Sequence, residues 1–172
     1  MKRIIFNIGA LFMIGGLVVS CSPDDGSSCP EDYTGALQAT EEKLVGEWVL
    51  SGIMADEAVD ITDDDQDNPS TDLFVQYDEC QKEAAYTFDE DRSYTYQQGI
   101  NGTDCPNRAS ISGSWQFSSS TLSIIFSCDI QNLVITLNGS DTAFSFSNNF
   151  NVTDIDGNVV NTDITFTYSL VP

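Results

Sequence analysis

The stretch Ser110-Ile111-Ser112-Gly113-Ser114-Trp115-Gln116-Phe117 alternates apolar and polar side chains with a period of two. This period is typical of a β-strand with one buried face, and here Ile111, Trp115 and Phe117 share that face. The alternation recurs elsewhere in the 172-residue chain, over residues 122–126, 133–137 and 160–170. We therefore predict an all-β protein.

Turn signals separate these runs, at residues 89–92, 118–120, 138–139 and 156–158. Asn138-Gly139 supplies the positive φ angles that a tight hairpin needs. No helical pattern is long enough to serve as a crossover, so neighbouring strands are expected to be antiparallel and joined in chain order. A meander of this kind removes its edges by closing on itself. The pattern predicts an antiparallel up-and-down barrel of about eight strands, with a β-sandwich as the alternative.

The chain begins with a predicted export signal. Lys2 and Arg3 precede an apolar or small-residue run over residues 4–19, broken only by Asn7, which is typical of a signal peptide. A bilayer core takes about 20 apolar residues to cross, so this run is too short for a permanent anchor.

The residues at the end of this run, Leu17-Val18-Val19-Ser20-Cys21, resemble the bacterial lipobox. The resemblance implies removal of residues 1–20, lipidation of the Cys21 thiol and acylation of the new amine. The alternative is an ordinary secretory cut that leaves Cys21 free or disulfide-bonded. Several acyl chains hold a protein at a membrane far better than one.

Residues 21–39 start with a small, polar stretch, Ser22-Pro23-Asp24-Asp25-Gly26-Ser27-Ser28, whose composition predicts a flexible tether. Its Ser-x-Asp-Asp core resembles the acidic signal that sends lipoproteins of the Bacteroidota to the cell surface, although a plain linker explains it as well. The expected location is the outer membrane of a Gram-negative bacterium, by lipid anchor, on the periplasmic or the surface side.

Charge excludes several functions. The chain has 6 Lys and Arg against 27 Asp and Glu, no His, and a net charge of -21. Such a surface repels nucleic acid and anionic headgroups, so we expect no nucleic-acid partner and no membrane contact apart from the lipid anchor. Without imidazole, Ser-His and Cys-His nucleophile pairs and zinc sites that contain histidine are excluded.

With Cys21 assigned to lipid, four cysteines remain, and they allow three pairings in an oxidising compartment. Cys80 precedes one predicted strand and Cys105 follows its hairpin partner, which brings them together. We therefore predict Cys80–Cys105, which leaves Cys29–Cys128 to fasten the N-terminal segment to the body. The four are not spaced in the close pairs of an all-cysteine zinc site.

The first predicted strand opens with Leu44-Val45-Gly46-Glu47-Trp48, after a helical turn at Thr40-Glu41-Glu42-Lys43. Together with the lipobox, the Cys80 segment, the Tyr86 to Tyr96 hairpin, Cys105 and Gly113-Ser114-Trp115, it resembles the lipocalin-like lipoproteins of Bacteroidota. The resemblance covers roughly residues 40–137 and implies a small barrel domain over 40–172, with an internal cavity for small apolar ligands.

The chain departs from the lipocalin pattern in two ways. It stops at Pro172, directly after its last predicted strand, where lipocalins commonly add a helix. The basic residue that often covers the signature tryptophan near the end of a lipocalin barrel is also absent, because the last basic residue is Arg108. Both departures weaken a ligand-carrier assignment by analogy, since fold does not fix function.

An acidic insert occupies residues 56–72. Asp63, Asp65 and Asp67 match positions one, three and five of an EF-type calcium loop, but position twelve is Phe74, which leaves Asp72 as the nearest substitute ligand. The insert is either a weak calcium site or a solvated loop. We expect no other cofactor.

Three functions fit these features. The first is a non-enzymatic protein that holds a small apolar or amphipathic ligand among Trp48, Trp115, Phe117 and Phe126, unless these rings only fill the core. The second is a surface interaction protein that presents acidic loops to a protein, glycan or calcium on a packed barrel. The third is a hydrolase with two carboxylates, although no acid pair is selected by its spacing, so we do not expect an enzyme. The sequence has no signal for an oligomeric state.

Overall fold

The computed structural model describes residues 28–172, so Cys21 and the predicted signal peptide lie outside the described residues. Its regular secondary structure is almost all strand, with three short helical turns among the described residues. In order, its elements are η1 (Glu42–Leu44), β1 (Gly46–Val59), β2 (Ser70–Asp72), η2 (Phe74–Gln76), α1 (Glu79–Lys82), β3 (Ala84–Phe88), β4 (Ser93–Gln98), β5 (Ala109–Ser118), β6 (Thr121–Phe126), β7 (Asp129–Val134), β8 (Thr136–Leu137), β9 (Ala143–Thr153) and β10 (Val159–Leu170).

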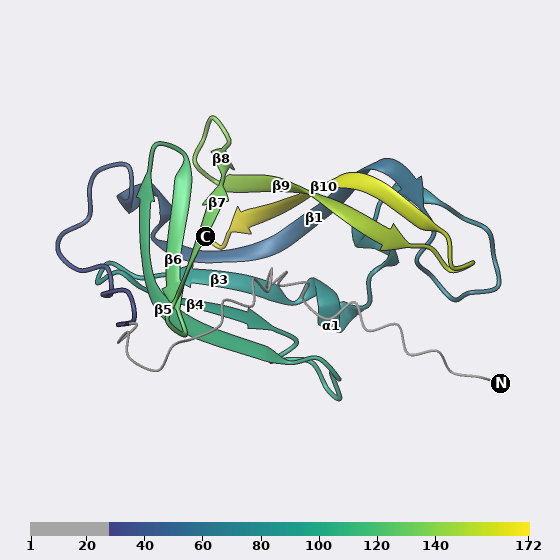
Figure 1. The fold of residues 1–172 in the computed structure, drawn as a ribbon, viewed down its shortest axis with the longest axis horizontal. Coiled ribbons are helices and arrows are strands. Elements are labelled where there is room, and N and C mark those ends of the chain that lie inside the picture. The colour runs from purple at the N-terminus through teal and green to yellow at the C-terminus, as the bar shows by residue number, and fades with distance from the viewer. Residues whose placement is uncertain (1–27) are drawn as a thin grey trace, which may run out of the picture.

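These strands form an antiparallel, nearly closed barrel (Figure 1). Apart from β2, which pairs only with β1, the strand order is β7-β6-β5-β4-β3-β1-β10-β9-β8. A single residue, Ile135, separates β7 from β8, so the two are halves of one strand that pairs with β6 on one side and β9 on the other. The last strand pairs with the first. The predicted up-and-down barrel of about eight strands is confirmed, and the sandwich alternative is not adopted.

The β8–β9 junction is the shortest pairing in the barrel wall. Only Thr136 and Leu137 have partners there, Ser145 and Phe144. In contrast, β9 and β10 are paired along their whole length, from Val159 to Ser169.

The strand predicted over residues 110–117 is β5, and its glycine has a packing role. A Cβ added to Gly113 would lie 1.9 Å from the carbonyl oxygen of Ile125 on β6. No side chain fits there, so a glycine at this position lets β5 and β6 approach closely. The next two residues, Ser114 and Trp115, are both buried, which interrupts the strict alternation predicted for this strand.

Three strands continue past the barrel as an arm, on the right of Figure 1. They are β1, β9 and β10, and β2 pairs with the outer half of β1. The arm has its own buried side chains: Ile53, Val59, Leu73, Val152 and Ile164. The predicted acidic insert over 56–72 is therefore shorter in the structure, because β1 runs to Val59 and β2 begins at Ser70.

One end of the barrel is closed by a packed cluster that includes Leu44, Trp48, Phe88 and Trp115, each with 0% exposure. The predicted helical turn is present as η1, which begins two residues and ends one residue later than expected. It places the carbonyl of Leu44 where the indole of Trp48 donates to it at 2.7 Å. We call this cluster the closed end.

The two predicted disulfides, Cys29–Cys128 and Cys80–Cys105, are both present. The first fixes the start of the described chain to the β6–β7 turn. Further along, the backbone N–H of Tyr33 donates to the Ser114 hydroxyl. The tether predicted over 21–39 is therefore held against the barrel from Cys29 onward.

Candidate functional site

The four aromatic residues predicted to hold a ligand lie in or against the core. Trp48 and Trp115 belong to the closed end, and Phe88 packs on Trp115 with ring centroids 5.2 Å apart. Phe117 and Phe126 are partly buried and pack against the same core. The tryptophans therefore fill this end of the barrel and present no free ring surface.

A buried ion pair, which was not predicted from the sequence, lies beside these tryptophans. The Arg92 guanidinium donates to both carboxylate oxygens of Glu41, at 2.8 and 2.7 Å. Arg92 also donates to the carbonyls of Gly35 and Ala36, which holds the N-terminal segment in place. A basic residue does lie at the tryptophan end of this barrel, but it comes from the β3–β4 turn and not from the end of the chain.

The pair is fully satisfied. Glu41 also accepts from the backbone N–H groups of Gln38 and Phe117. Burial by itself would raise the pKa of Glu41, but these hydrogen bonds and the Arg92 charge lower it below its usual value. Hydrogen bonding to Glu41 raises the pKa of Arg92 in turn. A buried pair with all its partners in place fixes geometry, and we assign it a structural role.

A second aromatic group lies deeper along the barrel, next to the closed end. Tyr86 on β3 faces Tyr96 on β4, with ring centroids 4.9 Å apart, and Tyr168 on β10, with centroids 5.1 Å apart. The rings of Tyr168 and Phe144 stack at 5.2 Å. The inward face of each strand places these rings, because Tyr86 pairs across the sheet with Trp48 and with Tyr96. We call Tyr86, Tyr96 and Tyr168 the tyrosine site.

The hydroxyl groups of the tyrosine site differ from the other polar groups of the barrel interior. Tyr96 donates to the Gln98 side chain at 2.8 Å. Tyr86 and Tyr168 make no side-chain hydrogen bond within residues 28–172, although Tyr168 is only 4% exposed. No fully buried side-chain nitrogen or oxygen in this part of the chain lacks a partner. These two hydroxyl oxygens therefore reach accessible space, where water or a ligand can contact them.

The surroundings of these phenols oppose negative charge. Burial raises the pKa of Tyr96 to about 12. Burial also raises the pKa of Tyr86 and of Tyr168, and the neighbouring phenols raise both further. The phenols are neutral at physiological pH and act as hydrogen-bond donors and acceptors.

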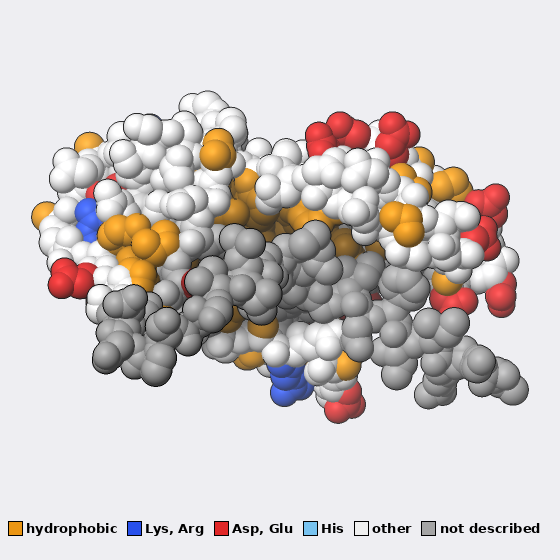
Figure 2. Space-filling view, viewed as in Figure 1, with side chains coloured by type: hydrophobic (Ala, Val, Ile, Leu, Met, Phe, Trp, Pro, Cys, Tyr) orange, Lys and Arg blue, Asp and Glu red, His pale blue; other side chains and the backbone are white. Residues whose placement is uncertain are grey.

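From the tyrosine site a row of rings continues onto the arm. Phe146 lies 6.2 Å from Tyr168 and 5.3 Å from Phe166, and Phe150 lies 5.9 Å from Phe166, all between ring centroids. These three phenylalanines are half-buried, because the other barrel strands of the described chain end before the arm. Figure 2 shows hydrophobic side chains in the middle of the molecule, between the barrel and the arm.

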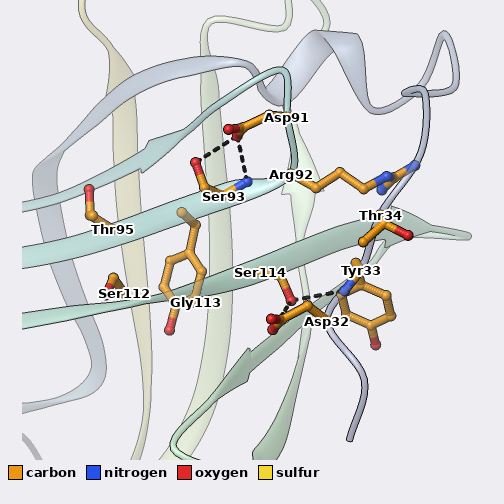
Figure 3. A pocket seen from close by; sticks show the side chains of 11 residues that line it. Asp32, Tyr33, Thr34, Asp91, Arg92, Ser93, Thr95, Ser112, Gly113 and Ser114 are labelled. Atoms are coloured by element: carbon orange, nitrogen blue, oxygen red, sulfur yellow. Dashed lines mark hydrogen bonds between the residues drawn. The ribbon is translucent and has the colours of Figure 1, made fainter.

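A polar groove of about 460 Å³ lies on the outside of the barrel, where the N-terminal segment crosses β4 and β5 (Figure 3). Its polar groups bond to each other: Ser114 donates to Asp32, and the Ser93 backbone and hydroxyl donate to Asp91. The Arg92 side chain leaves the groove toward the N-terminal segment. Tyr94 also lines the groove. We attribute the groove to the way the N-terminal segment packs over β4 and β5.

A smaller pocket of about 210 Å³ lies at the β8–β9 junction. Leu137, Phe144 and Thr167 are among its lining residues. The ring of Phe144 also stacks on Tyr168 of the tyrosine site.

The acidic loop is organised by its own hydrogen bonds. Asp60 is 5% exposed and accepts from the backbone N–H groups of Asn68 and Thr62, and these bonds lower its pKa. Asp64 accepts from Gln66 and from the Asn68 side chain.

The predicted calcium ligands do not form a cluster in this loop. Within residues 28–172, no group of three or more Asp, Glu, Cys or His side chains is placed to hold a metal, so Asp63, Asp65, Asp67 and Asp72 are not brought together. Calcium binding by these residues stays a prediction.

The tyrosine site was not predicted from the sequence. The Tyr86 to Tyr96 hairpin served there only as part of a resemblance, and Tyr168 only as one apolar position in a long strand. A usable signal was present: three tyrosines at inward positions of strands, where a phenylalanine would fill the core without a hydroxyl to satisfy.

The fold and the site define the class: an antiparallel β-barrel whose architecture is compatible with a ligand-binding scaffold. The chain belongs to the DUF5004 family, a domain of unknown function, which matches residues 22–171. No curated protein and no solved structure matches the chain. None of the helices among the described residues is long and apolar enough to cross a membrane.

Proposed function

We propose that this protein is a non-enzymatic, lipid-anchored binding protein of the outer membrane, which holds a small apolar or amphipathic ligand at the tyrosine site. One observation carries the ligand proposal. Within residues 28–172, the hydroxyls of Tyr86 and Tyr168 lack hydrogen-bond partners, whereas Trp48, Trp115, Arg92 and Glu41 all have theirs. Pockets of small-molecule binders combine apolar walls with a few such polar groups.

The row of rings supplies the apolar walls. Phe146, Phe150 and Phe166 extend the site along the arm and remain half-buried. A ligand with an apolar body lying on them would cover this surface and gain about 25 cal/mol for each Å² removed from water. The polar part of the ligand would then lie at the phenols.

The lipocalin resemblance agrees with this proposal in fold but not in the position of the ligand. The signature tryptophan, Trp48, is 0% exposed and belongs to the closed end. The proposed ligand lies next to the closed end, at the tyrosine site, on the side where β1, β9 and β10 extend past the barrel.

Binding can be tested with the neutral dye N-phenyl-1-naphthylamine and the chain from residue 22 onward, which holds the whole barrel and both disulfides. We expect saturable binding of one dye per protein, seen as a rise in dye fluorescence. Replacing both hydroxyls, with Tyr86→Phe and Tyr168→Phe together, should weaken it by about three- to tenfold for each hydrogen bond lost. Tyr33→Phe, in the N-terminal segment, is the matched control and should leave it unchanged. Absence of saturable binding would refute the ligand proposal.

The anchor proposal rests on the lipobox resemblance and on the family match, which starts directly after Cys21. It is tested separately in an expressing Gram-negative host. Wild-type protein should sediment with the outer membrane, whereas Cys21→Ser should be found in the soluble fraction. Cys21→Ser protein that still sediments with the membrane would contradict anchoring through this residue.

A further inference from the structure

The charged residues of the barrel bear on which ligand charge the tyrosine site can accept. Only four basic residues lie within residues 28–172, and each has another partner. Lys43 pairs with Asp141, Lys82 pairs with Glu79 and lies over the Phe74 ring, Arg92 pairs with Glu41, and Arg108 donates to the Gly102 carbonyl.

Within the described residues, no unpaired cation is therefore available to a carboxylate at the tyrosine site. An anionic head group would lose its hydration there and gain no ion pair, which is costly in an apolar setting. The whole molecule adds to this effect, because a net charge of -21 repels anions and concentrates cations around it.

A cation gains from the same features. The rings of Tyr86, Tyr96, Tyr168 and Phe146 offer π faces along one path, with neighbouring centroids 4.9 to 6.2 Å apart. Aromatic faces attract ammonium groups, most strongly where water is excluded. The free phenolic oxygens of Tyr86 and Tyr168 can accept a hydrogen bond from a protonated amine.

We propose that the tyrosine site selects a cationic amphipathic ligand, in which an apolar chain lies on Phe146 and Phe166 and carries a protonated or quaternary ammonium at the tyrosines. This inference rests on the proposed function, because it names the chemical class of the ligand for the same site. A preference for cations would distinguish this barrel from one that carries fatty-acid anions.

The test is a series of three ligands that share one ten-carbon chain and differ only in the head group: decyltrimethylammonium, 1-decanol and decanoate. Binding to the chain from residue 22 onward is measured by calorimetry, with every ligand well below its micelle concentration. The buffer contains 0.5 M NaCl, which shortens the range of surface electrostatics to a few ångströms. We expect decyltrimethylammonium to bind about tenfold more tightly than 1-decanol, and decanoate more weakly than both.

A ring deletion locates the effect. Tyr96→Leu removes one π face from the site and keeps an apolar side chain of useful size. It should reduce the preference for decyltrimethylammonium over 1-decanol by about three- to fivefold, whereas Tyr33→Leu should leave the preference unchanged. Circular dichroism of each variant verifies that the barrel is folded.

The outcomes distinguish the two proposals. Tighter binding of the ammonium ligand that depends on Tyr96 supports the inference. Equal binding of all three ligands, tighter binding of decanoate, or a preference that Tyr96→Leu leaves intact would overturn it while the binding function stands. If none of the three ligands binds, both the inference and the proposed function fail.

Discussion

The closed end and the tyrosine site are both aromatic, yet they treat their polar groups differently. At the closed end the indoles of Trp48 and Trp115 each donate to a backbone carbonyl, and Arg92 and Glu41 satisfy one another. At the tyrosine site two of three hydroxyls have no partner among the described residues. Folding alone explains the first arrangement. The second leaves two phenols to water or to the proposed ligand, so we assign stability to one end and propose binding at the other.

The largest expected effect comes from the closed end. Trp48→Ala removes a fully buried indole and should lower the free energy of unfolding by about 3 to 5 kcal/mol, measured by urea denaturation. Val49→Ala, at the adjacent and more exposed position, is the control and should cost far less. A loss below about 1 kcal/mol for Trp48→Ala would mean that this end is not the stabilising one.

Next in size is the buried ion pair. Glu41→Gln leaves Arg92 as an uncompensated buried charge and should cost about 3 kcal/mol at pH 7. Because the folded pKa of Glu41 lies below its unfolded value, its contribution is fully present above about pH 4.3 and is lost as the pH falls through the folded pKa.

The stability gap between wild type and Glu41→Gln should therefore narrow in urea melts recorded from pH 6 down to pH 3. Glu42→Gln, at the neighbouring exposed position, should show no comparable gap at any pH. A gap that widens toward low pH would contradict the assigned ion pair.

The two disulfides close loops of different length, so their contributions to stability should differ. The Cys29–Cys128 bridge closes a loop with a sequence separation of 99, and Cys80–Cys105 one of 25. On the chain-entropy account, removing the longer loop with paired Ser substitutions should cost about 1 kcal/mol more than removing the shorter one. Thermal unfolding of the two double variants checks the order, and equal or reversed losses would show that strain or residual structure outweighs loop length.

The smallest effect on stability is expected where the effect on binding is largest. Tyr168→Phe deletes a hydroxyl that has no hydrogen-bond partner within residues 28–172, so the free energy of unfolding should change by less than about 1 kcal/mol. Urea denaturation measures the change, and Tyr96→Phe, which loses the bond to Gln98, is the comparison. A large loss of stability in Tyr168→Phe would show that its hydroxyl is satisfied within the fold, and the contrast between the two ends would disappear.

Period-two patterning was enough to predict the strands, their antiparallel order and the closed barrel, because each strand has one buried face. Cysteine positions on a hairpin were enough to predict both bridges. The Arg92–Glu41 pair was beyond such reasoning, since it joins residues 51 positions apart through a turn with no local signal.

The arm and the tyrosine site could not be predicted from the sequence, for a related reason. Alternation along β9 and β10 shows which face is apolar, but not that neighbouring strands end early and leave Phe146 and Phe166 half-covered. Whether a tyrosine hydroxyl finds a partner depends on residues far away in the chain. Sequence spacing therefore located the aromatic residues of the closed end, as in Trp48 and Trp115, but not the open positions beside them.

The barrel wall has a weak seam where β8 meets β9. Two paired positions join these strands, whereas every other neighbouring pair in the wall shares at least four. Separating β8 from β9 breaks the fewest backbone hydrogen bonds of any neighbouring pair in the wall. Backbone amides there should therefore exchange with deuterium faster than those of β9 and β10 along their shared length. The small pocket is lined by residues of both strands, among them Phe144, whose ring stacks on Tyr168. Parting the seam would give a ligand lateral entry to the barrel interior while the rest of the wall stays intact.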